Sequence, residues 1–243
     1  MYQIRRKADH FNFKNQWLDA RWHFSFSNYY DPENINFGPL RVLNDDVIQG
    51  DNGFPIHGHR EMEIVTVLKR GELSHYDSHG SSGIIVPGEV QKMSAGRGIQ
   101  HSEWNYGKEP AELLQIWFNP GIEGLDPSYA QTQYEVRPEG LTILGSPNGA
   151  AGGVPIYQDV VMALGDTDGS LEEFEIAPGR GAYIHVVSGE PAIDGEGFSA
   201  GDAVRISSDH ERVRFAGEGR VLILDVPLLQ ERRPSTLFAD AAV

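Results

Sequence analysis

Short apolar runs, separated by glycine, proline and polar residues, recur along this chain of 243 residues. Each run has about the length of one strand, and the 28 glycines and 14 prolines leave few windows for a long amphipathic helix. Regularly spaced short strands with turn residues between them are typical of β-sandwiches and β-barrels. The pattern therefore predicts an all-β protein. The clearest runs are Ile64–Leu68, Ile84–Val86, Leu113–Phe118, Tyr183–Val187 and Val221–Val226.

Residues 119–153 interrupt this pattern, because they are rich in glycine, proline and polar side chains, as an inter-domain connection would be. The two flanking parts share an order of strand, Gly-Glu turn, strand, Gly-acidic turn and strand. The matching segments are Val67–Glu72 and Val86–Val90 in the first part, and Val186–Glu190 and Ala200–Val204 in the second. This order predicts two copies of one β-barrel module, which we assign to residues 1–135 and 136–243.

Composition and charge exclude several classes of function. The net charge of −15 repels phosphate backbones, so we expect no direct binding to nucleic acid. Neither a signal-peptide pattern nor an apolar run of membrane-spanning length occurs, so we expect a soluble, cytoplasmic protein that does not contact a membrane. We also expect a monomer. Because the chain has no cysteine, a bound metal must use histidine, carboxylate and water.

Two segments with the same spacing carry the strongest chemical signal, His57-Gly58-His59 and His101-Ser102-Glu103. Residues i and i+2 of a strand point to the same face, so each segment presents two donors side by side. If the two strands are neighbours, four ligands converge on one ion and leave positions open for a substrate. Iron(II), manganese, nickel, copper and zinc all accept such ligands. Glu63 has the same strand parity as His57 and His59, so spacing alone leaves it as a competing ligand.

The remaining histidines carry weaker signals. His75 and His79 lie in the polar stretch Ser74–Gly83, for which we expect a solvated hairpin outside the site. His185 and His210 stand singly, without a second donor two residues away, so we expect no metal in the second module.

Three further features are interpreted as structural. His23 lies in a run of aromatic residues and is expected to be packed or hydrogen-bonded. Asp45 and Asp46 are adjacent and point to opposite faces of a strand, which favours turn or capping roles over an acid-base pair. The segment Gln230–Val243 is either a loose extension or a strap across a barrel.

The order of the two segments resembles the metal-binding motifs of the cupin superfamily, small β-barrels that hold a metal with His, His, Glu and His. His57, His59 and Glu63 match the first motif, and Gly98, His101 and Asn105 match the second. Two departures distinguish this chain. Gly96 stands where the second motif usually has proline, and one residue fewer than in many cupins separates His59 from Glu63.

The departures are shared by a narrower group, the pirin family, and the chain resembles its shorter bacterial, quercetinase-like members. The likeness is dense from Trp17 to Phe118 and general beyond Gly153. The segments that carry it are Trp17–Asp19, His23–Pro32, Leu40–Asp46, Pro87–Ile99 and Leu114–Trp117.

The resemblance implies a bicupin with one metal site in its N-terminal domain and a C-terminal cupin-like domain without metal. The implied ligands are His57, His59, His101 and Glu103. Glu63 is not among them, and we expect it to line the pocket beside the site. We expect one divalent transition metal, iron(II) first, with copper, nickel, manganese and zinc as alternatives. Four apolar residues are candidates for the mouth of the site: Phe54, Ile56, Met93 and Trp104.

The implied activity is that of a quercetin 2,3-dioxygenase, which cleaves a flavonol with dioxygen to a depside and carbon monoxide. As the only proton acceptor among the four ligands, Glu103 is expected to take the proton of the flavonol 3-hydroxyl. Two alternatives stay open. One is a metal-binding, redox-sensitive regulatory protein without turnover, and the other is a cupin enzyme that acts on another enol or a catechol.

Overall fold

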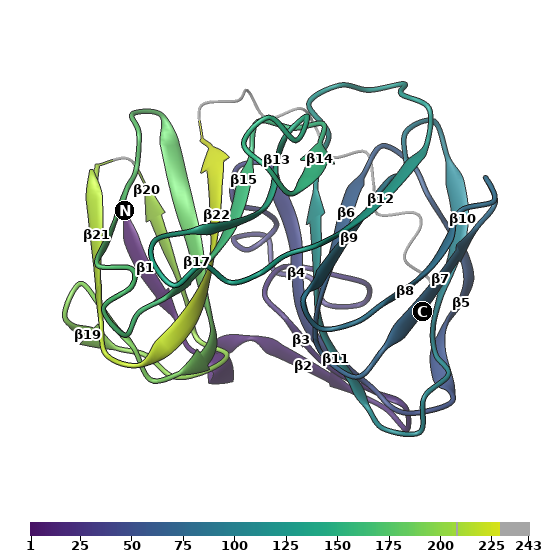
Figure 1. Ribbon diagram of the computed structural model, residues 1–243, viewed down its shortest axis with the longest axis horizontal. Helices are drawn as coiled ribbons and strands as arrows, with labels where there is room; N and C mark the ends of the chain where they lie inside the picture. The colour runs from purple at the N-terminus through teal and green to yellow at the C-terminus, as the bar shows by residue number, and fades with distance from the viewer. Residues whose placement is uncertain (208, 229–243) are drawn as a thin grey trace.

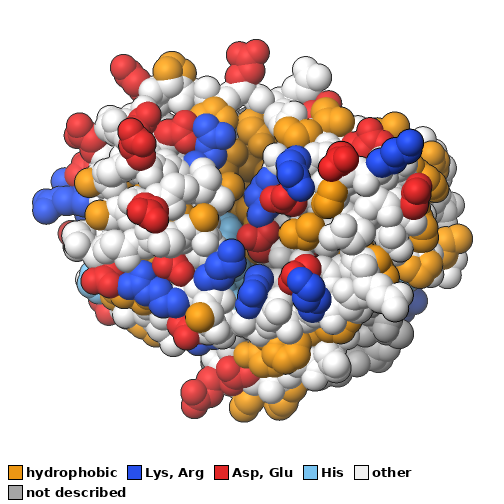
Figure 2. All heavy atoms as spheres, turned by 90° about the horizontal axis from the view of Figure 1, so that it is seen from below, with side chains coloured by type: hydrophobic (Ala, Val, Ile, Leu, Met, Phe, Trp, Pro, Cys, Tyr) orange, Lys and Arg blue, Asp and Glu red, His pale blue; other side chains and the backbone are white. Residues whose placement is uncertain are grey.

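The structure is a computed structural model that describes residues 1–207 and 209–228, and nearly all of its regular elements are strands (Figure 1). The segment Gln230–Val243 (grey in Figure 2) lies outside the described residues, so neither of the two roles expected for it is tested. The helix η1 (Lys7–Asp9) is a single 3-10 turn. Within the described residues, no helix has the length and apolar character that crossing a membrane requires.

The first domain consists of two antiparallel sheets that form opposite walls of an open barrel (Figure 1). Its large sheet has seven strands in the order β12-β9-β6-β11-β4-β3-β2, and its small sheet has four in the order β5-β10-β7-β8. The strands are β2 (Phe11–Lys14), β3 (Leu18–Trp22), β4 (Leu40–Ile48), β5 (Asn52–His59), β6 (Glu63–Arg70), β7 (Leu73–Asp77), β8 (Ser82–Ile85), β9 (Glu89–Ser94), β10 (Ile99–Asn105), β11 (Ala111–Phe118) and β12 (Ser128–Gln133).

The second domain repeats this plan. Its large sheet has the order β1-β20-β17-β22-β15-β13-β14, and its small sheet has the order β16-β21-β18-β19. The strands are β1 (Tyr2–Arg5), β13 (Thr142–Pro147), β14 (Val154–Ile156), β15 (Val161–Asp166), β16 (Glu173–Glu175), β17 (Arg180–Gly189), β18 (Ala192–Ile193), β19 (Glu196–Gly197), β20 (Ala203–Ser207), β21 (Arg212–Ala216) and β22 (Gly219–Pro227).

The two domains correspond strand by strand, with β9-β6-β11-β4 matching β20-β17-β22-β15, and β5-β10-β7-β8 matching β16-β21-β18-β19. Even the turn glycines correspond, since Gly71 directly after β6 and Gly189 at the end of β17 have φ values of +78° and +80°. A left-handed backbone at these turns explains why glycine occupies both positions. The all-β, two-module prediction is confirmed, in the form of two-sheet open barrels.

The chain does not keep to one domain at its beginning. β1 pairs with β20 in the second domain, although we assigned residues 1–135 to the first. η1 and β2 then carry the chain across to the large sheet of the first domain (Figure 1). Between β12 and β13 the pairing changes from the first domain to the second, and the boundary at residues 135 and 136 stays a prediction.

An apolar core joins the two large sheets. Val65 and Val67 of β6 pack in one cluster with Leu164, Leu222 and other residues of the second domain. The intervening side chains of β6 face the interior of the first barrel. Because both faces of this strand are buried, its sequence is a continuous apolar run rather than an alternating one. The large sheets therefore form a packed wall opposite the small sheet that carries the predicted ligands.

Candidate metal centre

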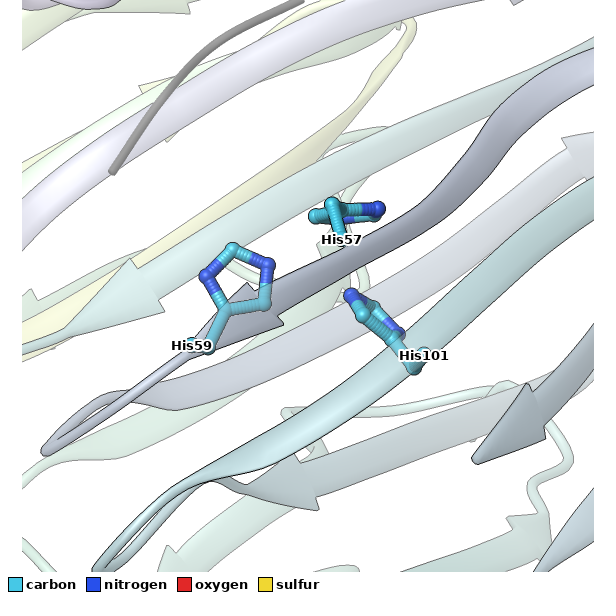
Figure 3. Close-up of side chains that lie close together, drawn as sticks. All are labelled: His57, His59 and His101. Carbon is cyan, nitrogen blue, oxygen red and sulfur yellow. The ribbon is translucent and has the colours of Figure 1, made fainter. Parts of the chain in front are cut away.

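Three imidazoles meet on the inner face of the small sheet in the first domain (Figure 3). β5 and β10 are antiparallel neighbours, and their register sets His101 opposite His57. The ring centroids of His57, His59 and His101 lie 4.4–5.0 Å apart. One ligand nitrogen from each lies within 4.8 Å of the others, which is a group that a single metal ion can join. The predicted convergence of the two segments is thus observed for the three histidines.

The turn before β10 explains one departure from the general cupin motif. Gly96 has a φ of +45°, whereas the ring of proline holds φ near −65°. A side chain at this position would also bring its Cβ to 2.1 Å from the carbonyl oxygen of Leu125. Glycine at position 96 therefore allows the turn that delivers His101 onto the strand.

The nitrogens of the three histidines are arranged as metal ligands require. The Nδ1 of His57 lies 2.8 Å from the carbonyl oxygen of Pro55, so it carries the proton and leaves Nε2 free. The Nε2 atoms of His59 and His101 are buried and have no hydrogen-bond partner. Burying unpartnered nitrogen atoms is costly unless another group binds them. The donor set therefore fits a bound divalent metal.

Burial also keeps the histidines in the form that binds metal. The low-polarity surroundings, followed by repulsion from His101 and His57, lower the pKa of His59 to about 3. Burial, followed by the effects of His57 and His75, lowers the pKa of His101 to about 2. At neutral pH both imidazoles are neutral, and a neutral imidazole has the lone pair that coordinates a metal.

Glu103 is buried on the same face of β10 as His101. Its carboxylate oxygens are each 3.1 Å from the Nε2 of Gln115, which donates to them, and the hydroxyl of Thr66 lies 3.5 Å from one oxygen. The carboxylate comes within 4.8 Å of ligand atoms of His101 and His75, which form a second group. Of the four predicted ligands, the structure thus groups the three histidines together and links Glu103 to them through His101.

His75 is a site residue that the sequence interpretation missed, and its expected place in a solvated hairpin is wrong. It is fully buried on β7, directly opposite Glu103 of β10. Its Nδ1 lies 3.4 Å from the Nδ1 of His101, and its Nε2 lies 3.2 Å from the Oδ2 of Asp77. The apolar Leu73, two residues earlier on the same face, was the signal that could have placed His75 inside. His79, in contrast, is exposed as expected.

Asp45 and Asp46 point to opposite faces as expected, but they lie within β4 and neither serves as a turn or cap. Asp45 pairs with Lys69 outside the barrel. Asp46 is only 2% exposed inside it, and its Oδ1 has no hydrogen-bond partner. Burial, followed by the charges of Asp45 and Glu103, raises the pKa of Asp46 well above its usual value. Asp46 is therefore a buried carboxyl group inside the first barrel whose surroundings favour its protonated form.

The pocket role predicted for Glu63 is wrong. A turn at residues 60–62, with Glu61 at φ +49°, separates β5 from β6 and breaks the shared parity with His57 and His59. Glu63 instead forms a buried ion pair with Lys92 at 3.3 Å and accepts a hydrogen bond from the backbone N–H of Tyr157. It therefore ties the two domains together.

The predicted apolar mouth is only partly observed. Phe54 lies near the site, with its ring centroid 6.3 Å from that of His57. Ile56 is 74% exposed on the outer side of the small sheet, and Trp104 alternates with the inward-facing Glu103. Met93 is fully buried in an apolar cluster against which Trp117 packs. The ring of Trp117 contacts His59 at a centroid distance of 4.8 Å, so this tryptophan is a wall of the site that we did not predict.

The other predicted structural histidines are placed as follows. His23 is buried, and its Nδ1 lies 2.8 Å from the hydroxyl of Tyr183, so its packed role is confirmed. His185 is buried next to His23, with ring centroids 5.0 Å apart, and His210 is exposed. Both metal-competent groups found among the described residues lie in the first domain.

Comparisons with known proteins agree with this architecture. Residues 3–118 match the Pirin family model, and residues 143–226 match that of the quercetinase C-terminal cupin domain. Quercetin 2,3-dioxygenase of Escherichia coli strain K12 is 36% identical, over 93% of this chain and 99% of that protein. A pirin-like protein of Caulobacter vibrioides is 37% identical, over 86% of this chain and 91% of that protein.

Solved structures extend the likeness to three dimensions. The crystal structure of YhhW from Escherichia coli has a TM-score of 0.89 at 34% identity, covering 96% of this chain and all of that one. A second structure, of the bacterial pirin YhhW from Escherichia coli in complex with nickel(II), has a TM-score of 0.88 at 35% identity over 94% of this chain and all of that one. On its sequence, its two-domain fold and its convergent histidines, this chain belongs to the pirin family.

Proposed function

We propose that this protein is a metal-dependent dioxygenase of the quercetin 2,3-dioxygenase type, which cleaves a flavonol with dioxygen to a depside and carbon monoxide. The observation that carries the proposal is the convergence of His57, His59 and His101, with Glu103 adjoining, in one barrel. The near full-length similarity to the quercetin 2,3-dioxygenase of Escherichia coli supports the same reaction class. A divalent metal is the cofactor, and we propose iron(II) as the native ion.

His57, His59 and His101 would hold the metal through their Nε2 atoms, and Glu103 would complete the ligand set. When bound, the metal supplies a Lewis acid that lowers the pKa of a flavonol hydroxyl and a redox partner for dioxygen. The nickel(II) complex of the related YhhW shows that a bacterial pirin accepts a divalent ion. The imidazoles and the carboxylate also suit iron(II), so the choice of ion rests on metal analysis.

Glu103 is the proposed proton acceptor for the flavonol 3-hydroxyl. Gln115 donates to both of its carboxylate oxygens, which holds the group in one orientation within the barrel. The buried surroundings keep bulk water away from the transferred proton. The proton leaves the substrate oxygen and forms an O–H bond with the Glu103 carboxylate, so the substrate reacts as an electron-rich anion.

Differences in burial indicate the side from which a substrate approaches. His101 and Glu103 are buried, whereas His57 and His59 on β5 keep part of their surface exposed. A planar aromatic molecule would therefore enter at β5, and the rings of Phe54 and Trp117, which contact His57 and His59, offer apolar surfaces for it.

The test is an aerobic assay of the metal-loaded protein with quercetin, followed by loss of the flavonol absorbance and by detection of carbon monoxide. We expect both signals in air and neither without oxygen. Unchanged absorbance in air, with the metal bound, would overturn the dioxygenase proposal. A redox-dependent binding partner found under those conditions would favour a regulatory protein without turnover. Turnover of another enol or of a catechol would favour a cupin enzyme with a different substrate.

A further inference from the structure

Three histidines outside the metal centre are buried between the two domains. His10 follows η1, His23 follows β3, and His185 lies on β17 of the second domain. The rings of His10 and His23 are stacked with centroids 3.6 Å apart, and the rings of His23 and His185 meet edge to face at 5.0 Å. His23 and His185 are 0% exposed, and His10 is 4% exposed. His23 also lies 2.8 Å from the hydroxyl of Tyr183 through its Nδ1, but the proposed reaction uses none of the three histidines.

Two arginines extend the same cluster from neighbouring strands of the second domain. Arg5 lies on β1, and Arg205, which is 5% exposed, lies on the adjacent β20. The guanidinium of Arg205 is 4.7 Å from the ring centroid of Phe24, and its Nη2 donates to the side-chain oxygen of Asn34. The Nε atoms of both arginines are buried without a partner. An arginine Nε–H is always a donor, so both groups lack an acceptor.

Unpartnered nitrogen atoms are concentrated here. Among the described residues, seven of the fourteen buried side-chain nitrogen and oxygen atoms without a hydrogen-bond partner belong to these five side chains. They are Nε of Arg5, both ring nitrogens of His10, Nε2 of His23, both ring nitrogens of His185, and Nε of Arg205. Such a concentration of unpaired nitrogen atoms favours a site that binds a polar group, because native proteins leave few buried polar atoms unpaired.

The nearby carboxylates do not supply the missing acceptors, because they have other partners. Asp45 is paired with Lys69, and Asp202 accepts from the backbone N–H of Lys7 and from Arg6. Asp9 accepts from the backbone N–H of Arg6. Asp31 accepts from the backbone N–H of Glu33. The cluster therefore has an excess of donors.

The same groups argue against a second metal site. The ligand atoms of these three histidines are absent from the groups that a metal ion can join. Two arginine side chains would also repel a cation. Burial, followed by the effects of His185 and Arg5, lowers the pKa of His10 to about 3, whereas a bound anion would favour the protonated form of this histidine.

We propose that His10, His23, His185, Arg5 and Arg205 form a binding site for a small oxyanion, of the size of phosphate or a simple carboxylate. Arginine and imidazole N–H groups are the donors that such anions prefer. A ligand at this site would join the two domains and stabilise their contact.

The experiment compares inorganic phosphate and acetate with chloride at equal ionic strength. Thermal unfolding and isothermal titration calorimetry are run on the metal-loaded protein, on Arg5→Gln and on His185→Asn. Arg212→Gln is the matched control, because Arg212 is exposed on β21 in the small sheet of the second domain. Near-ultraviolet circular dichroism establishes that each variant keeps its native packing, and Arg5→Gln, at a partly exposed edge strand, is the milder of the two cluster changes.

We expect saturable binding of phosphate or acetate to the wild-type protein and to Arg212→Gln, with a rise in melting temperature that chloride does not reproduce. Both cluster variants should bind at least tenfold more weakly. The anion that binds more tightly tells whether the natural ligand is a phosphate or a carboxylate. The proposal is overturned if neither anion binds saturably, or if natively packed Arg5→Gln and His185→Asn bind as well as the wild-type protein.

Discussion

The two domains share one topology but fill their barrels differently. In the first domain, β10 points His101, Glu103 and Asn105 inward. In the second, the corresponding β21 points Val213 and Phe215 into an apolar cluster. Figure 1 shows these strands in equivalent positions of the two barrels. Chemistry in this fold thus depends on a few inward-facing positions, and the strand framework is the same whether those positions carry ligands or a core.

The polar interior has a cost that the apolar interior avoids. Glu103, Gln115 and Thr66 form hydrogen bonds with one another, and His75 lies within hydrogen-bond distance of Gln91 and Asp77. The Oδ1 of Asp46, in contrast, has no partner. Buried polar groups reduce stability unless each finds a partner. The second barrel has an apolar core, and the apolar contact between the large sheets adds further stabilisation that offsets this cost. Because the polar residues line the first barrel and the apolar core fills the second, substitutions can affect the proposed chemistry and the stability separately.

The largest expected effect comes from His101→Ala, which removes the histidine shared by both groups of ligand atoms. We expect loss of metal and of flavonol turnover together, because fewer than three imidazoles then remain around the ion. Metal content by mass spectrometry and the aerobic assay measure the two effects. His79→Ala, at an exposed histidine of the same domain, should change neither. Full metal content in His101→Ala would show that the ligand assignment is wrong.

Glu103→Gln should reduce turnover by about 10²- to 10⁴-fold, the usual loss when a positioned general base is removed. The three histidines stay in place, so metal should still bind, although more weakly. Steady-state kinetics at matched metal content separates the two effects. Unchanged turnover would remove Glu103 from its role as the proton acceptor.

Phe215→Ala should destabilise the protein by about 3–5 kcal/mol, because it leaves a cavity in the core of the second barrel. Metal content and turnover should persist at temperatures where the variant is folded. Urea unfolding gives the stability, and Ile122→Ala, at an exposed position, is the control. A loss of metal in folded Phe215→Ala would show that the second barrel does more than support the first.

Asp46→Asn should have the smallest effect. We expect the free energy of unfolding to rise by an amount of the order of 1–3 kcal/mol, and only above acidic pH. The pKa of Asp46 is raised in the folded state. As the pH rises through the ordinary pKa of an aspartate, the unfolded chain therefore loses this proton while the folded protein still keeps it. Folding then holds a proton that the unfolded state has lost, and stability falls with rising pH. Asparagine cannot titrate, so the variant should lose less stability between pH 4.5 and pH 7. Parallel unfolding curves of the metal-free proteins test this, and identical pH dependences would contradict it.

The fold and the convergence of the three histidines could be predicted from the sequence because both depend on local patterns. Strand parity and glycine turns are local, and they correctly placed His57, His59 and His101 on one face. His75 was missed because the polar composition of its hairpin concealed the burial of Leu73, Ser74 and His75, the first three residues of β7. Glu63 was misplaced because a single turn with Glu61 at positive φ reverses the face that the next strand presents.

Contacts between the domains were beyond prediction for a different reason. The cluster of His10, His23 and His185 joins segments that are far apart in the chain, and each histidine appears isolated in the sequence. The pairing of β1 with β20 likewise requires the folded second domain. Such contacts depend on how two finished barrels pack, and no periodicity within one segment encodes them.

The most direct test of a metal centre confined to the first barrel is anomalous X-ray diffraction from crystals of protein purified without added metal, recorded above and below the iron edge. We predict one metal peak, at about 2.0–2.2 Å from the Nε2 atoms of His57, His59 and His101, with Glu103 completing the ligands. A peak held by His75 and Glu103 without His57 and His59, or a peak in the second barrel, would contradict the account.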